Sequence, residues 1–116
     1  MNEAILVTIK KMLGLDEDDH SFDDDILIHL NGTLLILHQV GISTVESFDT
    51  IDTGLTWADC FGEDISRTTL NAVKNYMYMK VRKGFDPPQS GTTMESLDAL
   101  IREYEWRLNV SVDPAE

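Results

Sequence analysis

The tripeptide Asp86-Pro87-Pro88 constrains the fold of this chain more than any other feature. It lies between two segments with helical periodicity, Ser66–Phe85 and Thr92–Asn109. The residue before a proline is disfavoured in the helical region, and proline has no N–H with which to continue a helix. The first helix must therefore stop here, and the second starts in a direction that the prolines restrict. Such a stiff elbow suits a protein that holds a shape, and it carries no sign of chemistry.

Two further segments, Asn2–Leu13 and Asp23–Val40, also have apolar residues at helical spacing. Asn2 can cap the first of them, and Gly14 and Gly41 follow them as expected for helix ends. Strand signals are nearly absent, because the chain has no two-residue hairpin turn and no sustained alternation of apolar and polar residues. These patterns predict four main helices.

Residues 42–65 form the least regular part of the chain. Within them, Trp57 and Phe61 have the spacing of one short helical turn that packs on the core. The expected fold is all-α, a compact bundle of four main helices with an irregular middle segment. A length of 116 residues predicts one α-helical domain spanning residues 1–116, with residues 110–116 as a flexible tail.

The net charge is −12, and it is unevenly distributed along the chain. Residues 1–65 hold 2 basic and 14 acidic residues, whereas residues 66–116 hold seven of each. Free binding to a nucleic-acid backbone is therefore disfavoured, because the phosphates would be repelled. The charge favours basic protein partners, or an acidic wall that DNA passes without sticking.

Much of the acidity lies in the connector Asp16–Asp25. A calcium-binding loop needs Gly at its sixth position and Glu at its twelfth. Counted from Asp16, these positions hold Ser21 and Leu27, so the spacing excludes that motif. We expect the first four residues of the connector to form an acidic channel or contact surface: Asp16, Glu17, Asp18 and Asp19.

No catalytic, metal-ligating or cofactor-binding residue is predicted, and we do not expect an enzyme. His29 and His38 lie nine residues apart, which places them on opposite faces of one helix. The single cysteine, Cys60, is best interpreted as a small buried hydrophobe. No Ser–His–Asp arrangement, Gly-rich phosphate loop or paired-His metal motif is found.

The segment Asp23–Val40 is apolar almost all round. One wide face is formed by Ile26, Leu27, Leu30, Leu34 and Leu37, whereas Ile28 and Leu35 lie away from it and Ile36 lies elsewhere again. Such a helix is either buried centrally, or it faces its own core on one side and another subunit on the other. Both interpretations stay open, and the second makes Ile28, Leu35 and Ile36 candidates for an oligomer interface.

The last predicted helix, Thr92–Asn109, has one aromatic residue that lies outside its apolar face. One arc of about 120° holds Met94, Leu97, Leu100, Ile101, Tyr104 and Leu108, and Trp106 lies on the far side with Arg102. Trp and Arg are common anchors of protein interfaces, so Trp106 either contacts a partner or is covered by the irregular segment. Val110 and Val112, in the predicted tail, are further candidates for a partner contact.

A series of short motifs runs in order along the chain. It comprises Ile5–Gly14 (Ile-Leu-x-x-Ile-Lys-Lys-x-Leu-Gly), Phe22-Asp23-x-Asp25-Ile26, His29-Leu30-Asn31, Leu37-x-Gln39-Val40-Gly41, Val73-Lys74-x-Tyr76, Lys80-Val81, Phe85-Asp86-Pro87-Pro88 and Glu105-Trp106-Arg107-Leu108-Asn109. This series resembles small head–tail connector (adaptor, head-completion) proteins of tailed bacteriophages that infect Gram-positive hosts.

The resemblance implies a small α-helical structural protein of the virion, without enzymatic activity or cofactor. It implies assembly as a ring, usually twelve-fold, beneath the portal protein. Such a ring contacts the portal, a tail-side connector or tail protein, and other copies of itself. It joins the DNA-filled head to the tail and leaves a channel through which DNA passes without specific binding.

Before assembly, the protein would reside in the host cytoplasm. No membrane association is expected, because no apolar run approaches the roughly 18–20 residues of a membrane span. The alternative hypothesis is an acidic DNA mimic that inhibits a host DNA-binding protein. A mimic should space its acids regularly, whereas here they bunch in Asp16–Asp25.

Overall fold

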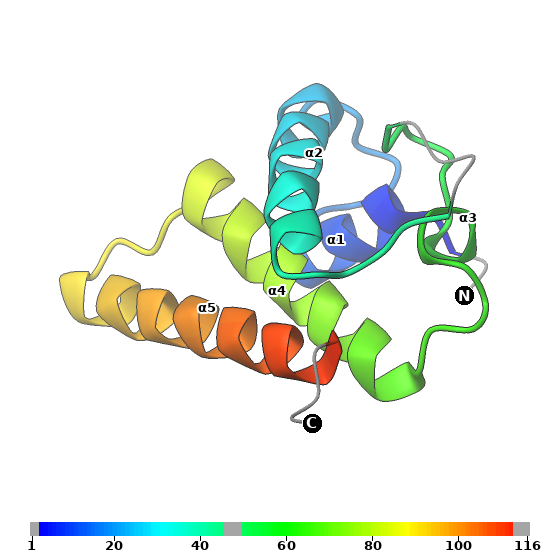
Figure 1. Ribbon diagram of the computed structural model, residues 1–116. Coiled ribbons are helices and arrows are strands. Elements are labelled where there is room, and N and C mark those ends of the chain that lie inside the picture. Colours follow the sequence, from blue (N-terminus) through cyan, green and yellow to red (C-terminus); the bar gives the residue numbers. More distant parts are fainter. Residues whose placement is uncertain (1–2, 46–49, 113–116) are drawn as a thin grey trace.

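The computed structural model describes residues 3–45 and 50–112, with the backbone alone for residues 111 and 112. It contains five helices: α1 (Ile5–Leu13), α2 (Asp23–Gln39), α3 (Trp57–Phe61), α4 (Arg67–Phe85) and α5 (Gly91–Val112) (Figure 1). Over these residues the only β-type pairing is one isolated bridge between Ala4 and Thr56. The prediction of an all-α fold is therefore confirmed.

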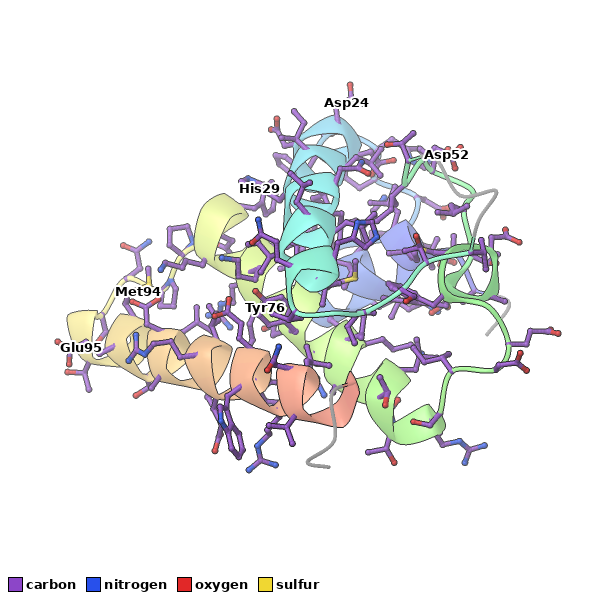
Figure 2. All side chains as sticks on the ribbon, viewed as in Figure 1. Asp24, His29, Asp52, Tyr76, Met94 and Glu95 are labelled. Carbon is purple, nitrogen blue, oxygen red and sulfur yellow. The ribbon has the colours of Figure 1, made fainter. Side chains whose placement is uncertain are left out.

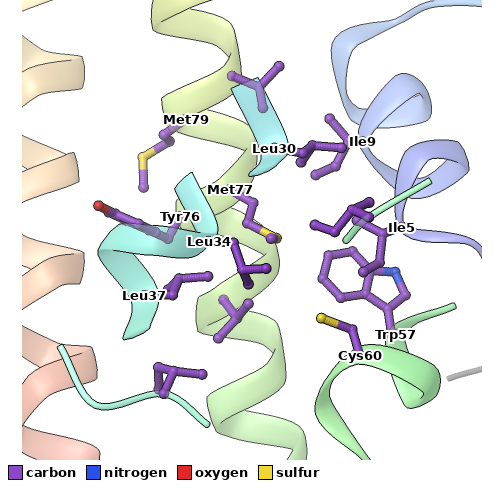
Figure 3. Packing of buried hydrophobic residues seen from close by; sticks show 14 of the residues in the cluster. Ile5, Ile9, Leu30, Leu34, Leu37, Trp57, Cys60, Tyr76, Met77 and Met79 are labelled. Atoms are coloured by element: carbon purple, nitrogen blue, oxygen red, sulfur yellow. The ribbon is translucent and has the colours of Figure 1, made fainter. Parts of the chain in front are cut away.

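Helix α4 is the element on which the others pack. It contacts α1, α2 and α5, and α1 also contacts α2. In Figure 1, α4 runs diagonally through the molecule, with α5 along one side and α1 and α2 on the other. The buried core lies mainly between α4 and the N-terminal helices, where Ile9, Leu30 and Met77 have no exposed surface (Figure 3).

The N-terminal helix begins three residues later than predicted. Its first residue is Ile5, and Ala4 occupies the N-cap position without a side-chain hydrogen bond. The Ile5 N–H donates to the Leu55 carbonyl at 2.9 Å, and the Trp57 N–H donates to the Glu3 carbonyl at 3.3 Å. The preceding backbone is thus extended, because it pairs with the middle segment. The predicted cap, Asn2, lies outside the described residues.

The elbow between α4 and α5 has the predicted form. Helix α4 ends at Phe85, and Asp86 leaves the helical region with φ −140° and ψ 69°. The hydroxyl of Ser90 then accepts a hydrogen bond from the Thr93 N–H at 3.4 Å, and α5 begins at Gly91. Helix α5 continues through Val110 to Val112, three residues beyond the helix end predicted at Asn109. Residues 113–116 lie outside the described residues.

The irregular middle segment contains the expected short helix. Thr56 and Asp59 form a capping box around its first turn, with bonds of 3.1 and 3.2 Å. Trp57 and Phe61 stack with ring centroids 6.1 Å apart, and both are buried. Figure 3 shows Trp57 beside Cys60 and Ile5. The predicted packing of this aromatic pair on the core is confirmed.

One side chain of α2 holds Thr50 and Ile51 of the irregular segment in place. The Asn31 amide donates to the carbonyls of Leu27 and Ile51, both at 3.0 Å. Its oxygen accepts from the Ile51 N–H and the Thr50 hydroxyl, both at 2.9 Å. Asn31 therefore uses its donors and its acceptor to hold backbone that no helix or strand would satisfy.

Candidate interaction surfaces

Helix α2 has one buried face and one exposed apolar face. Ile26, Leu30 and Leu37 have no exposed surface, whereas Ile28 is 69% exposed and Leu35 is 66% exposed. The interpretation of α2 as a centrally buried helix is therefore wrong. Ile36 differs from the other two candidates because it is half-buried and packs against the core.

A groove of about 430 Å³ runs between α2 and the end of α4. It is lined from α2 by Ile28, His29, Gly32, Thr33 and Ile36, and from α4 by Lys80, Lys83 and Gly84. We call it the Gly32 groove. Lys83 pairs with Asp98 at 2.6 Å. Lys80 has no ion-pair partner among residues 3–45 and 50–112.

The two glycines of this groove have different surroundings. A Cβ added to Gly84 would lie 2.5 Å from Cε1 of His29, so the His29 ring occupies the space that a side chain at position 84 would need. Figure 2 shows His29 on the side of α2 that faces the C-terminal part of α4. A Cβ added to Gly32 would meet nothing within 4 Å. The packing of the chain itself therefore explains Gly84 and leaves Gly32 unexplained.

Helix α5 also exposes apolar surface opposite its core stripe. Trp106 is 66% exposed and Val110 is 42% exposed. Arg102, four residues before Trp106, is exposed on the same stripe. The irregular segment does not cover Trp106, so that alternative is wrong. Val112 ends α5, and its side chain lies outside the described residues.

One member of the predicted core arc of α5 is misplaced. Leu97, Ile101 and Leu108 are buried, but Leu100 is 45% exposed. Leu100 lies at the edge of the predicted arc, so the stripe of α5 that packs against α4 is narrower than that arc. The apolar surface of α5 that faces solvent is therefore larger than predicted.

The acidic connector presents its carboxylates to solvent. Asp16, Glu17 and Asp18 are exposed, and Asp19 is half-buried. The Asp16 carboxylate accepts from the Asp18 N–H at 2.9 Å, and that of Asp19 accepts from the Ser21 N–H at 3.0 Å. The hydrogen bond from Ser21 lowers the pKa of Asp19. The loop therefore has a defined backbone and an outer surface rich in negative charge.

A buried lysine of α1 anchors the backbone of this loop. Lys10 is 2% exposed, and its ammonium donates to the carbonyls of Glu17 at 3.1 Å and Asp19 at 2.6 Å. It also forms an ion pair with Asp23 at 2.9 Å. Sequence reasoning missed this role. The available signal was that Lys10 follows Leu6 by four residues and therefore lies on the apolar stripe of α1.

The partner of this lysine has a shifted pKa. Burial by itself would raise the pKa of Asp23, but its contacts with Lys10 and with the His20 ring outweigh this effect. The net result is a lowered pKa, which keeps Asp23 ionised. The pair Lys10–Asp23 therefore joins α1, the connector and the start of α2 as a structural element.

Two other titratable groups have structural roles. Burial raises the pKa of the Cys60 thiol to about 12, so this side chain is not a thiolate at neutral pH. The Tyr76 hydroxyl donates to the Glu105 carboxylate at 2.5 Å and links α4 to α5. Burial and Glu105 together raise the pKa of Tyr76.

The part of the chain that the structure describes holds no group of three or more His, Cys, Asp or Glu side chains able to share a metal ion. Nor does any described helix have the length and hydropathy needed to cross a lipid bilayer. Three surfaces of the described residues stand out by their exposed side chains: the outer face of α2 with its groove, the outer stripe of α5, and the acidic connector.

A family model described as phage connector protein matches residues 5–115, which include all five helices. This chain belongs to the phage connector protein family. The connector family is a family of structural proteins and not of enzymes, and it places this protein in the virion with the portal and the tail as its general partners. A comparison with curated proteins found no match, and a comparison with solved structures found none either.

Proposed function

We propose that this connector assembles as a closed ring below the portal and joins the DNA-filled head to the tail. The ring is twelve-fold by the family resemblance, and its centre leaves a channel for DNA. Each subunit acts as one α-helical domain spanning residues 1–116. The virus infects a Gram-positive host, and the subunits reside in the host cytoplasm before assembly.

The observation that carries this proposal is the pair of unlike apolar surfaces on one small chain. Ile28 and Leu35 project from α2, and Trp106 and Val110 project from α5. Large exposed apolar side chains gathered on a surface mark contacts with other molecules. Two different surfaces that bind each other form a head-to-tail contact, and such contacts generate a ring when the rotation closes.

The remaining candidate residues fit the same contacts. Ile36 lines the Gly32 groove beside Ile28, and Arg102 stands one turn from Trp106. Val112, the last residue of α5, remains a candidate partner contact of the set. Arginine and aromatic residues dominate the binding energy of many interfaces, which makes Arg102 and Trp106 the strongest candidates of the set.

The acidic connector is assigned to the channel wall or to a contact beside it. The exposed carboxylates of Asp16, Glu17 and Asp18, together with Asp19, repel phosphates and let the genome slide without binding. The net charge of −12 supports the same role over a longer distance. A ring that bound DNA tightly would hinder its passage.

The proposal is tested by mixing the full chain with the portal protein of the same virus and measuring mass with and without portal. We expect a discrete ring that forms on the portal. In the assembled virion, electron microscopy should locate this ring between head and tail. Replacing Ile28 and Leu35 together by Ser should abolish it. Replacing the exposed Asn71 and Asn75 of α4 by Ser is the matched control, because these residues lie outside the proposed contacts. Failure of the native chain to bind portal or tail proteins would contradict the proposal.

A further inference from the structure

Gly32 lies in the interior of α2, on its exposed side between Ile28 and Leu35. Glycine destabilises the interior of a helix relative to alanine, because it loses more backbone freedom on folding. A methyl group at this position would have open space around it. Gly32 therefore lowers the stability of the isolated chain, and no contact within that chain requires a residue without a side chain at this position. A residue without a side chain benefits a contact in which another molecule approaches the helix backbone closely.

We propose that the Gly32 groove receives the Trp106 side chain of a second copy of this chain. This inference rests on the proposed ring, and it names the surfaces that would meet between neighbouring subunits. The groove has apolar side chains, Ile28 and Ile36, on either side of Gly32 along α2. Its volume of about 430 Å³ accommodates an indole ring. An exposed Trp that enters such a pocket gains apolar burial in a well-defined position.

The charges around the two surfaces are complementary. Lys80 and Lys83 line the α4 side of the groove, and Lys80 has no ion-pair partner within the described residues. Glu103 lies three residues before Trp106, on the same exposed stripe of α5, and its only described ion pair is a 3.3 Å contact with the exposed Arg107. A lysine ammonium near the face of an indole ring is also attracted to it.

In a second charge pairing, the positive charge is on α5 and the negative charge is on α2. Arg102 lies one turn before Trp106, and Asp24 and Asp25 lie one turn before Ile28 at the exposed start of α2. A copy that brings Trp106 to the groove thus brings the Glu103 carboxylate toward the lysines of α4. It also brings the Arg102 guanidinium toward the aspartates of α2. The donor and acceptor surfaces are different, so every copy can give one Trp106 and receive another, as a closed ring requires.

The first test is cross-linking in the assembled state. Leu35→Cys and Val110→Cys are made separately in a Cys60→Ala background, which leaves Gly32 and Trp106 in place. The two variants are mixed with portal protein and treated with a short bismaleimide. We expect Leu35–Val110 cross-links to exceed Leu35–Leu35 and Val110–Val110 cross-links at least tenfold.

The possible failures are distinguishable. If a ring forms on the portal but gives no Leu35–Val110 product, the inference is overturned and the proposed ring stands. If the native chain forms no ring with portal, the proposed function fails and this inference falls with it. A Cys at exposed Asn71 of α4 is the matched control, and it should cross-link to neither position.

A second test uses the size of the groove. Gly32→Ala should leave thermal unfolding unchanged or raise its midpoint, yet weaken ring association at least tenfold. Gly91→Ala is the control, since this exposed glycine also has open space around it. Trp106→Phe, with its smaller ring, should restore part of the association lost in Gly32→Ala. Losses that simply add in the double variant would overturn the contact between these two residues.

Discussion

The two tryptophans of this protein lie in regions of opposite character. Trp57 belongs to a helix of 5 residues inside an irregular segment, and it has no exposed surface. Trp106 belongs to a helix of 22 residues with regular periodicity, and it is 66% exposed. Regular secondary structure and burial are therefore separate properties. A long helix needs only one face to be covered, whereas a short one has to be enclosed by the rest of the chain.

The polar contacts follow the same division. The Trp57 indole N–H donates to the Thr8 hydroxyl at 2.8 Å, and the Lys74 ammonium lies 5.3 Å from its ring centroid. Around Trp106, the nearest described ion pair is the exposed one between Glu103 and Arg107 at 3.3 Å. Pairs of this kind contribute little to stability in water. The region of Trp57 is completed by the chain itself, whereas Trp106 stays exposed, as the proposed contact with a neighbouring copy requires.

The strongest test of this comparison removes each tryptophan in turn. Trp57→Ala should lower the free energy of unfolding by about 3–5 kcal/mol, because it leaves a large cavity in the core. Trp106→Ala should change it by less than about 0.5 kcal/mol. Denaturant unfolding of the isolated chain measures both. Equal losses for the two variants would contradict the division between a completed and an open region.

A smaller effect is expected from the contacts that hold the middle segment on α2. Asn31→Ala should cost about 1–3 kcal/mol, since it leaves the buried backbone of Ile51 without its partners. In this variant, amide hydrogen exchange should accelerate more at Ile51 than in α5. Asn71→Ala, on the exposed side of α4, is the control and should have almost no effect. Unchanged exchange at Ile51 would mean that other contacts hold the segment.

Acid should selectively weaken the contacts of Asp23, near the end of the acidic loop Asp16–Asp25. The folded pKa of Asp23 lies below its unfolded value of about 3.9. The ionised carboxylate therefore stabilises the fold above that value, and the contribution is lost as the pH falls through the folded pKa. Asp23→Asn should be less stable at neutral pH and should show a flatter loss of stability in acid. Asp24→Asn, on the exposed face, should follow the parent protein in both respects.

The smallest effect concerns the free chain alone. Gly32→Ala should raise the free energy of unfolding by about 0.5–1 kcal/mol, because alanine is the better helix former and has room here. Gly84→Ala should instead be destabilising through its clash with His29, and His29→Ala should remove much of that loss. Thermal unfolding of the two single variants and the double variant measures these differences. A stabilising Gly84→Ala would mean that His29 moves away freely.

Several features of the fold were accessible from local patterns. The end of α4 at Phe85 follows from the two prolines, and the packing of Trp57 and Phe61 follows from their spacing. The start of α1 was not accessible, because residues 3–5 pair with Leu55 and Trp57 from far along the chain. The role of Asn31 was missed for the same reason. Its partners at Thr50 and Ile51 lie in a segment without periodicity.

The amino-acid sequence by itself determined the helices, the elbow at Asp86-Pro87-Pro88, the acidic front half and the membership in the phage connector family. These properties depend on residues close in the chain, or on their order along it. Only the tertiary structure decided which apolar face of α2 is covered, and that Trp106 stays outside while Lys10 goes inside. Burial depends on which distant segments meet, and periodicity reports that a face is apolar without reporting what covers it.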